Sequence, residues 1–262
     1  MRRRAKSDLK APFLRRMSLL PDMPEEAFSD YPLSLPVFQN GLDFTFERSI
    51  TIFVGANGSG KSTILEMIAA QCGFSLSGGT KNIAHRSMER ENLSQFVRLS
   101  WLPRVTQGFF FRAETFFQLV ETVDQLANEP GGHVAYRPYG GVSMRERSHG
   151  QSFMAVFENR FGSRGTYIID EPEAALSPER QLDFLKLLRR LDKKGDAQVI
   201  MATHSPILMA YPDAALIQIS SQGLSPIEFH ETAHFKIVRE FALNPDGFIA
   251  GVLLDAEAEE SE

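Results

Sequence analysis

A glycine-rich run that ends in lysine, serine and threonine is the part of this sequence best suited to chemistry. The run is Gly55-Ala56-Asn57-Gly58-Ser59-Gly60-Lys61-Ser62-Thr63, which fits the pattern G-x-x-x-x-G-K-[ST]. Glycines let the main chain turn tightly, so that several backbone N–H groups converge on a phosphate. Lys61 would reach the β- and γ-phosphates of a nucleotide, and the Ser62 hydroxyl would ligate Mg²⁺. We predict a phosphate-binding loop, in which Asn57 and Thr63 also touch phosphate.

Two predicted elements position this loop. Ser49–Val54 is a short, apolar, β-branched run typical of a buried strand, and it leads directly into the first glycine. After Ser62, apolar side chains recur at helical spacing on one face, namely Ile64, Leu65, Ile68 and Ala69. The helix would add partial positive charge at its N-terminus, where a phosphate binds. A chance glycine loop is the alternative, and the flanking strand and helix disfavour it.

A second apolar run, Thr166–Ile169, ends in two acids, Asp170 and Glu171. Ligands of open α/β sheets lie beyond the carboxyl ends of the strands, so both acids should emerge beside the phosphate loop. Asp170 would then be a Mg²⁺ ligand, because this ion prefers carboxylates, water and phosphate. Glu171 would orient and deprotonate the attacking water. The alternative is an ordinary strand end at the surface.

The rest of the pattern indicates an α/β fold with a mainly parallel sheet flanked by helices. Further strands are expected at 198–202 and 215–219, and a helix is expected between Ser177 as N-cap, Pro178 as first residue and Gly195 as stop. Residues from about 73 to 165 are richer in aromatic and polar residues, with glycine and proline breaks. We expect them to form a helical subdomain inserted into the α/β core.

Four motifs stand in the order found in the ABC-type ATPases, and the chain resembles that family over roughly residues 35–220. They are the phosphate loop, Ser148-His149-Gly150-Gln151, Asp170-Glu171-Pro172 and Thr203-His204-Ser205-Pro206. The acidic motif and the His-Ser-Pro sequence look most like stand-alone ATPases related to chromosome-maintenance and repair ATPases. The resemblance implies that His204 is a switch histidine, which hydrogen-bonds the γ-phosphate and holds the attacking water.

The same resemblance implies a dimer. In that family the signature loop, here Ser148, Gly150 and Gln151, acts on the nucleotide of the partner chain, so that two head-to-tail protomers sandwich two ATP molecules. Arg147 and His149 depart from the usual Leu-Ser-Gly-Gly-Gln of this loop. An ordinary polar turn that caps a helix is the alternative interpretation of the segment.

Two further residues are weaker candidates for the site. Gln107 lies between the phosphate loop and the signature, the interval that holds the family's glutamine for Mg²⁺ and water. The three phenylalanines that follow Gly108 fit a core strand better than a partner-binding surface. For stacking on adenine, Phe38 is the candidate that the sequence offers.

Composition limits the class of protein. The chain has 262 residues, 43% of them hydrophobic, and a formal net charge of −5, so overall charge does not indicate nucleic-acid binding. A single cysteine, Cys72, cannot form an internal disulfide. No uncharged stretch reaches the roughly 18 residues of a membrane-spanning helix. We therefore expect a soluble, cytoplasmic protein without a transmembrane segment of its own.

Charge is distributed unevenly along the chain. We divide it into a basic N-terminal arm (1–30), an ATPase domain (31–245) and an acidic C-terminal tail (246–262). Two frayed, solvated ends are the simpler interpretation. The alternative is that the basic arm binds an anionic partner such as nucleic acid or lipid headgroups.

Three functions are compatible with these features. The first is a soluble Mg-ATP-hydrolysing ATPase, whose ATP-bound homodimer opens on hydrolysis and acts on another protein or nucleic acid. The second is the ATP-binding subunit of a membrane transporter. The third is a nucleotide-gated binding module with little turnover, which the substituted signature would favour.

Overall fold

The computed structural model describes residues 8–76, 91–105, 107–129, 132–139, 141, 143, 149–161 and 163–259. Its strands are β1 (Leu14–Leu19), β2 (Asp43–Thr45), β3 (Ile50–Val54), β4 (Val97–Trp101), β5 (Gly108–Arg112), β6 (Gly165–Asp170), β7 (Ala197–Ala202), β8 (Ala215–Ser220) and β9 (Gly223–Pro226). Its α-helices are α1 (Pro36–Gln39), α2 (Lys61–Cys72), α3 (Phe116–Ala127), α4 (His149–Arg160), α5 (Pro178–Lys194), α6 (Pro206–Met209), α7 (Ala233–Leu243) and α8 (Pro245–Glu259). Short 3₁₀ helices are η1 (Glu25–Ser29), η2 (Glu91–Phe96), η3 (Gly132–Tyr139), η5 (Pro172–Ala175) and η6 (Phe229–Glu231).

A six-stranded sheet of order β5-β6-β7-β3-β8-β9 forms the centre of the molecule. Its first five strands run parallel and only β9 pairs antiparallel, which confirms the predicted α/β class. All four strands expected from the apolar runs are present as β3, β6, β7 and β8. In the register, Ala202 lies beside both Phe53 and Asp170, so the strands carrying the phosphate loop, the acids and His204 end at one edge.

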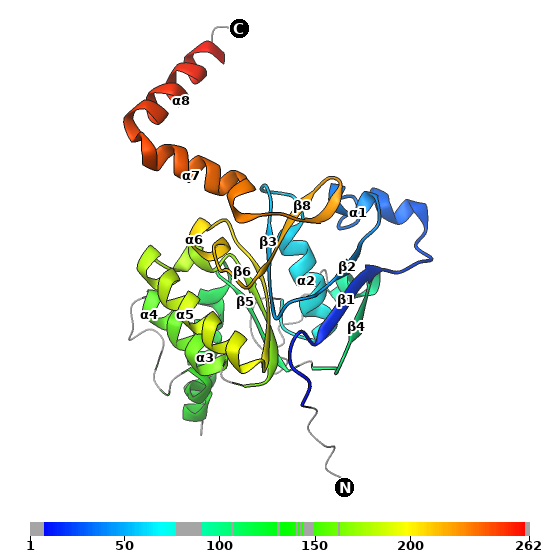
Figure 1. Ribbon diagram of the computed structural model, residues 1–262. Coiled ribbons are helices and arrows are strands. Elements are labelled where there is room, and N and C mark those ends of the chain that lie inside the picture. The colour runs from blue at the N-terminus through cyan, green and yellow to red at the C-terminus, as the bar shows by residue number, and fades with distance from the viewer. Residues whose placement is uncertain are drawn as a thin grey trace.

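Helix α2 is packed between this sheet and a smaller antiparallel sheet of order β2-β1-β4 (Figure 1). It contacts β6 and β7 on one side and β4 on the other. The apolar side chains of α2 lie in one core with Phe53 of the large sheet and Met17 of the small one. Nearly every face of the helix is therefore buried, which explains why its sequence carries apolar residues beyond the one predicted stripe.

Helices α3, α4, α5 and α6 gather on the other side of the large sheet (Figure 1). Phenylalanines from β5, α3, α4 and α5 meet there, with the Phe111 ring 5.0 Å from Phe153 and 4.7 Å from Phe157. Helix α5 begins and ends as predicted: Ser177 accepts a hydrogen bond from the Arg180 N–H, and Gly195 closes the helix with φ of 69°.

Several expectations about organisation are wrong. The N-terminal arm is not frayed throughout, because β1 pairs with both β2 and β4 and buries Leu14 and Met17. The stretch 73–165 is not purely an insertion, since β4 lies in the small sheet and β5 is an edge strand of the large one. The C-terminal tail is not frayed either, because Pro245–Glu259 is helix α8. The first seven residues of the basic arm lie outside the described part.

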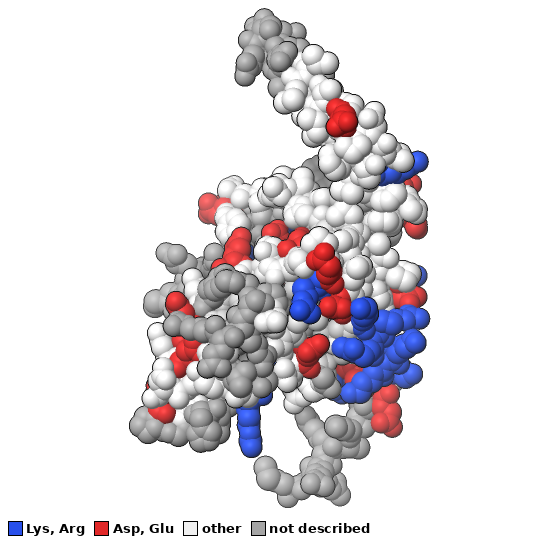
Figure 2. Space-filling view, turned by 90° about the vertical axis from the view of Figure 1, so that its left-hand side faces the viewer, with Lys and Arg blue, Asp and Glu red and all other residues white. Residues whose placement is uncertain are grey.

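Helices α7 and α8 form an arm that extends away from the body (Figure 1). No residue of α7 is buried, and α8 packs on α7 through Phe248 and Phe241, whose rings lie 6.0 Å apart. The arm is mainly uncharged in Figure 2, whereas Lys and Arg side chains gather in a cluster at one edge of the body. Large apolar side chains are exposed along it: Ile237, Val238, Phe241, Leu243, Ile249, Val252, Leu253 and Leu254. None of the described helices is long and apolar enough to cross a bilayer.

Candidate functional site

The phosphate loop joins β3 to α2, as the sequence predicts, and its glycines are needed for its shape. Gly58 and Gly60 have φ of 75° and 101°, in the left-handed region that other residues avoid. A Cβ on Gly60 would also come within 2.9 Å of Val37. The loop can therefore turn directly into the N-terminus of α2, whose first N–H groups are free of helical partners and suit an anion.

Lys61 is the first residue of α2 and folds back over the loop. Its Nζ donates to the carbonyl oxygens of Gly55 at 3.0 Å and Ala56 at 2.9 Å. Burial lowers the pKa of Lys61, while the nearby carboxylates of Glu171 and Asp170 oppose that shift. The ammonium group is thus held at the loop by two carbonyls that a phosphate oxygen could replace.

Ser62 and Asp170, the two residues predicted to bind Mg²⁺ together, are in direct contact. The Ser62 hydroxyl donates to Asp170 Oδ1 at 3.1 Å. Burial raises the pKa of Asp170 to about 6, against the opposing effect of Arg112. Both side chains offer oxygen, the donor that Mg²⁺ takes, so they fit the ion. In the described part no group of three His, Cys, Asp or Glu side chains could hold a metal ion.

Gln107 is not at this site, so the prediction that it ligates Mg²⁺ is wrong. Its carbonyl accepts from the Thr166 N–H at the amino end of β6, whereas Asp170 ends that strand. Gln107 does lie between the phosphate loop and the predicted signature. It precedes β5, however, and so lies at the end of the sheet opposite to the acids. The residue that β5 brings to the acids is Arg112, paired with Asp170 in the register and ion-paired with Glu66.

Glu171 directly follows β6 and has an unusual backbone. Its φ of 48° is the only positive value at a non-glycine residue in the described chain. Such a conformation costs free energy and persists only where the surroundings impose it, commonly at functional sites. Its N–H donates to the Ala202 carbonyl at 3.0 Å, and its carboxylate Oε1 lies 3.6 Å from His204 Nε2. The turn therefore separates Glu171 from Asp170 and aims it at His204.

His204 follows β7 and is held from two sides. Its backbone N–H donates to Glu173 at 2.5 Å, and the same carboxylate accepts from the Thr203 hydroxyl at 2.7 Å. Its ring Nδ1 lies 2.8 Å from Nε2 of His234, a residue of α7. Burial lowers the pKa of His204, and the nearby Lys61 lowers it further. The imidazole is accordingly neutral near pH 7.

Two family models match the chain and divide the site between them. One, described as "AAA domain", matches residues 35–110 and contains the phosphate loop. The other, described as "AAA domain, putative AbiEii toxin, Type IV TA system", matches residues 154–210 and contains the acids and His204. The chain is thus similar to AAA-type ATPase domains over both parts of the candidate site.

Similar proteins include ATP-binding proteins of transporters. The energy-coupling factor transporter ATP-binding protein EcfA2 of Spiroplasma kunkelii is 25% identical over 178 residues, which cover 60% of this chain and 56% of that protein. The hemin import ATP-binding protein HmuV of Pseudomonas entomophila is 28% identical over 183 residues, which cover 63% of this chain and 70% of HmuV. The match thus spans little more than half the length of EcfA2. Among solved structures, an SmcHead bound to the C-winged helix domain of ScpA superposes with a TM-score of 0.49 at 13% identity. The superposition covers 82% of this chain and 97% of the SmcHead chain.

The segment predicted to be the signature loop is described only in part. Ser148 lies outside the described residues, and α4 begins at His149 and includes Gly150. Gln151 is exposed and lines a shallow hollow with Glu158 of α4 and Arg180 of α5. No residue of the phosphate loop lines that hollow among those described.

The adenine candidate is wrong as well. Phe38 is fully buried in the core around α2, where it cannot stack on a base. The exposed aromatic residue beside the loop is Tyr31, whose hydroxyl lies 3.2 Å from the Thr63 hydroxyl. Only tertiary structure could distinguish the two, because each is an aromatic residue upstream of the loop.

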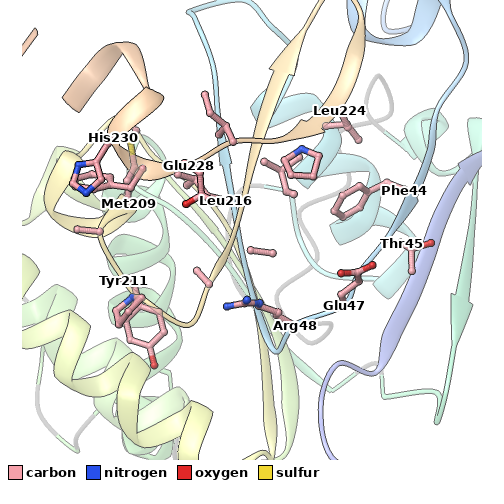
Figure 3. Close-up of a pocket in the computed structure, with 18 of the residues that line it drawn as sticks. Phe44, Thr45, Glu47, Arg48, Met209, Tyr211, Leu216, Leu224, Glu228 and His230 are labelled. Carbon is pink, nitrogen blue, oxygen red and sulfur yellow. The ribbon is translucent and has the colours of Figure 1, made fainter. Parts of the chain in front are cut away.

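A cavity of about 600 Å³ lies elsewhere, between the end of β2 and the β8–β9 hairpin. Figure 3 shows Arg48, Tyr211 and His230 around it, together with Phe44 from β2. Neither the described phosphate-loop residues nor the acids at the end of β6 line this cavity. It is therefore separate from the candidate phosphate site.

Proposed function

We propose that the chain binds Mg-ATP and hydrolyses its terminal phosphate. The observation that carries the proposal is the meeting of three strand ends: Lys61 and Ser62 after β3, Asp170 and Glu171 after β6, and His204 after β7. Glycine loop, lysine, hydroxyl, paired acids and histidine are the groups that phosphoryl transfer to water requires.

Each residue has a distinct part in this proposal. Lys61 exchanges the two loop carbonyls for phosphate oxygens, and Ser62 and Asp170 hold Mg²⁺, which supplies positive charge to the phosphates. Glu171 accepts a proton from the attacking water, and neutral His204 donates from Nε2 to the γ-phosphate. Arg112, which is ion-paired with Glu66 and Asp170, lowers the pKa of Asp170 against the raising effect of burial.

Tyr31 is the proposed contact for the base or ribose. Tyr31 as a whole residue is 62% exposed, although its hydroxyl lies within hydrogen-bond distance of Thr63 in the first turn of α2. An exposed aromatic ring fixed at the edge of a phosphate loop offers a stacking surface for a base.

Hydrolysis is proposed to occur in a head-to-tail dimer. In one protomer Gln151 lies with α4 and α5 instead of at the phosphate loop, so this signature residue would act on the nucleotide of a second copy. In such a dimer, the N-terminus of α4 from the partner would contact the γ-phosphate on the side that faces away from the phosphate loop.

Phosphate release from Mg-ATP by the wild type and Glu171→Gln tests the proposal. Loss of the general base should slow turnover by roughly 10²–10⁴-fold, because the amide cannot accept the proton. ATP should stay bound, and the variant should elute as a dimer, at twice the 29.4 kDa of the chain. Glu179→Gln, on the exposed first turn of α5, is the matched control. Wild-type turnover in Glu171→Gln would remove Glu171 from this role.

A transporter subunit is the second candidate, favoured by the similarity of the chain to EcfA2 and HmuV, which are transporter ATP-binding proteins. It requires a membrane-embedded partner, since no described helix of this chain could span a bilayer. Purifying the protein from solubilised membranes and, separately, from the soluble fraction distinguishes a transporter subunit from a stand-alone ATPase. Recovery with an integral membrane protein at constant ratio supports the transporter, and full activity of the isolated dimer supports the stand-alone ATPase. ATP-dependent dimerisation with negligible turnover would instead support a binding module.

A further inference from the structure

We propose that His234, at the start of α7, is a positioning residue that fixes the tautomer and orientation of His204. The inference rests on the proposed ATP hydrolysis and extends it to a helix outside the four motifs. The observation behind it is the short contact between His204 Nδ1 and His234 Nε2, at 2.8 Å. At that separation one nitrogen donates a hydrogen and the other accepts it.

Which of the two nitrogens donates the hydrogen follows from the proposed role of His204 in hydrolysis. A neutral imidazole carries one N–H, on either Nδ1 or Nε2. His204 Nε2 is buried, has no hydrogen-bond partner among the described residues, and lies 3.6 Å from Glu171 Oε1. In the proposed function this nitrogen faces the attacking water and the γ-phosphate. To donate to a phosphate oxygen, Nε2 must carry the hydrogen. Nδ1 must then accept, and the donor is the N–H at Nε2 of His234.

Without His234 the ring of His204 would have little to orient it. Glu173 fixes the main chain of His204 through the backbone N–H, but that bond leaves χ1 and χ2 free. The two imidazoles lie 5.0 Å apart, tilted by 56°, in contact as rings as well as through the bond. His234 therefore restricts both the rotation of the ring and the nitrogen that carries the hydrogen.

His234 is itself held firmly, as a positioning residue must be. Thr232, 1% exposed, caps α7 by accepting from the Phe235 N–H at 3.2 Å and donates to the Phe229 carbonyl at 2.8 Å. The Phe235 ring packs on Phe229 at 4.7 Å. Helix α7 also packs on α6, which begins just after His204. The arm is thus anchored at the end that carries His234.

A kinetic series separates positioning from packing. His234→Phe keeps a ring but removes the donor, whereas His234→Gln keeps an N–H donor. His234→Phe should lower kcat by about 10–100-fold with KM for Mg-ATP unchanged, because only the group that meets the transition state is disturbed. His234→Gln should restore most of kcat. The matched control is His230→Phe, since His230 packs on Phe229 and Phe235 without touching His204.

The result that overturns the inference is wild-type kcat in His234→Phe, or an equal loss in the Phe and Gln variants. A second measurement does not depend on turnover or on the stability of a variant. Imidazole ¹⁵N NMR of the wild type should show His204 with the hydrogen on Nε2, and the opposite tautomer would refute the assignment. If the wild type hydrolyses no ATP, the proposed function fails, while this spectrum still decides the role of His234.

Discussion

Asp170 is 3% exposed, and burial raises its pKa to about 6 although Arg112 lies against it. Because the folded-state pKa exceeds the ordinary 3.8, ionisation destabilises the folded protein. That penalty is absent below about pH 4 and complete above about pH 6. The buried carboxylate therefore lowers the stability of the folded protein, and the proposed Mg²⁺ would offset this cost.

Asp170→Asn should relieve this penalty. At pH 7.5 we expect the variant to be more stable than the wild type by roughly 1–3 kcal/mol, and the difference should vanish as the pH falls toward 4. Urea unfolding without nucleotide at several pH values measures it. Asp183→Asn, at an exposed carboxylate whose pKa is lowered by Lys186, should give no such gain. Destabilisation of Asp170→Asn at pH 7.5 would contradict the account.

Most residues of the candidate site could be predicted from their types and their place in the sequence. For the others, the position along a strand in the folded sheet decided whether they lie at the site. The glycine loop, Asp170, Glu171 and His204 could be found because each stands directly after an apolar run. Gln107 could not be assigned correctly, since sequence gives the interval but pairing decides which end of β5 faces the site. His234 carried no signal, because it reaches His204 only through the fold of α7.

At the scale of elements, helices α5 and α8 differ in how far their leucine side chains are buried. Leu188 of α5 is fully buried with Phe184 in the core, whereas Leu253 of α8 is 59% exposed on the arm. The N-cap Ser177 and the stop at Gly195 indicated both ends of α5. Helix α8 packs on the exposed helix α7, and the sequence showed no amphipathic stripe that would have indicated it.

Leu188→Ala should cost about 2–5 kcal/mol of unfolding free energy, because it leaves a cavity. Leu253→Ala should change that free energy by no more than about 0.5 kcal/mol, since its side chain is mostly in water. Denaturant unfolding of dilute protein compares them. A loss in Leu253→Ala that matches Leu188→Ala would show that the arm is packed against something in solution.

At the scale of the whole molecule, two sheets enclose α2, and the large sheet presents its strand ends at one edge. Apolar runs predicted the parallel sheet because both of its faces are covered. The small sheet was missed, since β1 is a mixed strand with Arg15 and Arg16 between buried residues and looked like a charged arm. Tertiary pairing with β2 and β4 makes it a strand.

The central claim is that ATP is bound at Lys61 and cleaved by water that Glu171 activates. A crystal structure with Mg²⁺ and a non-hydrolysable ATP analogue tests it most directly. We predict Lys61 Nζ on phosphate oxygens instead of the Gly55 and Ala56 carbonyls, Ser62 and Asp170 on the ion, and Glu171 aimed at a water in line with the γ-phosphorus, with the base against Tyr31. An analogue bound away from the phosphate loop, or a Glu171 carboxylate turned from the γ-phosphorus, would contradict the account.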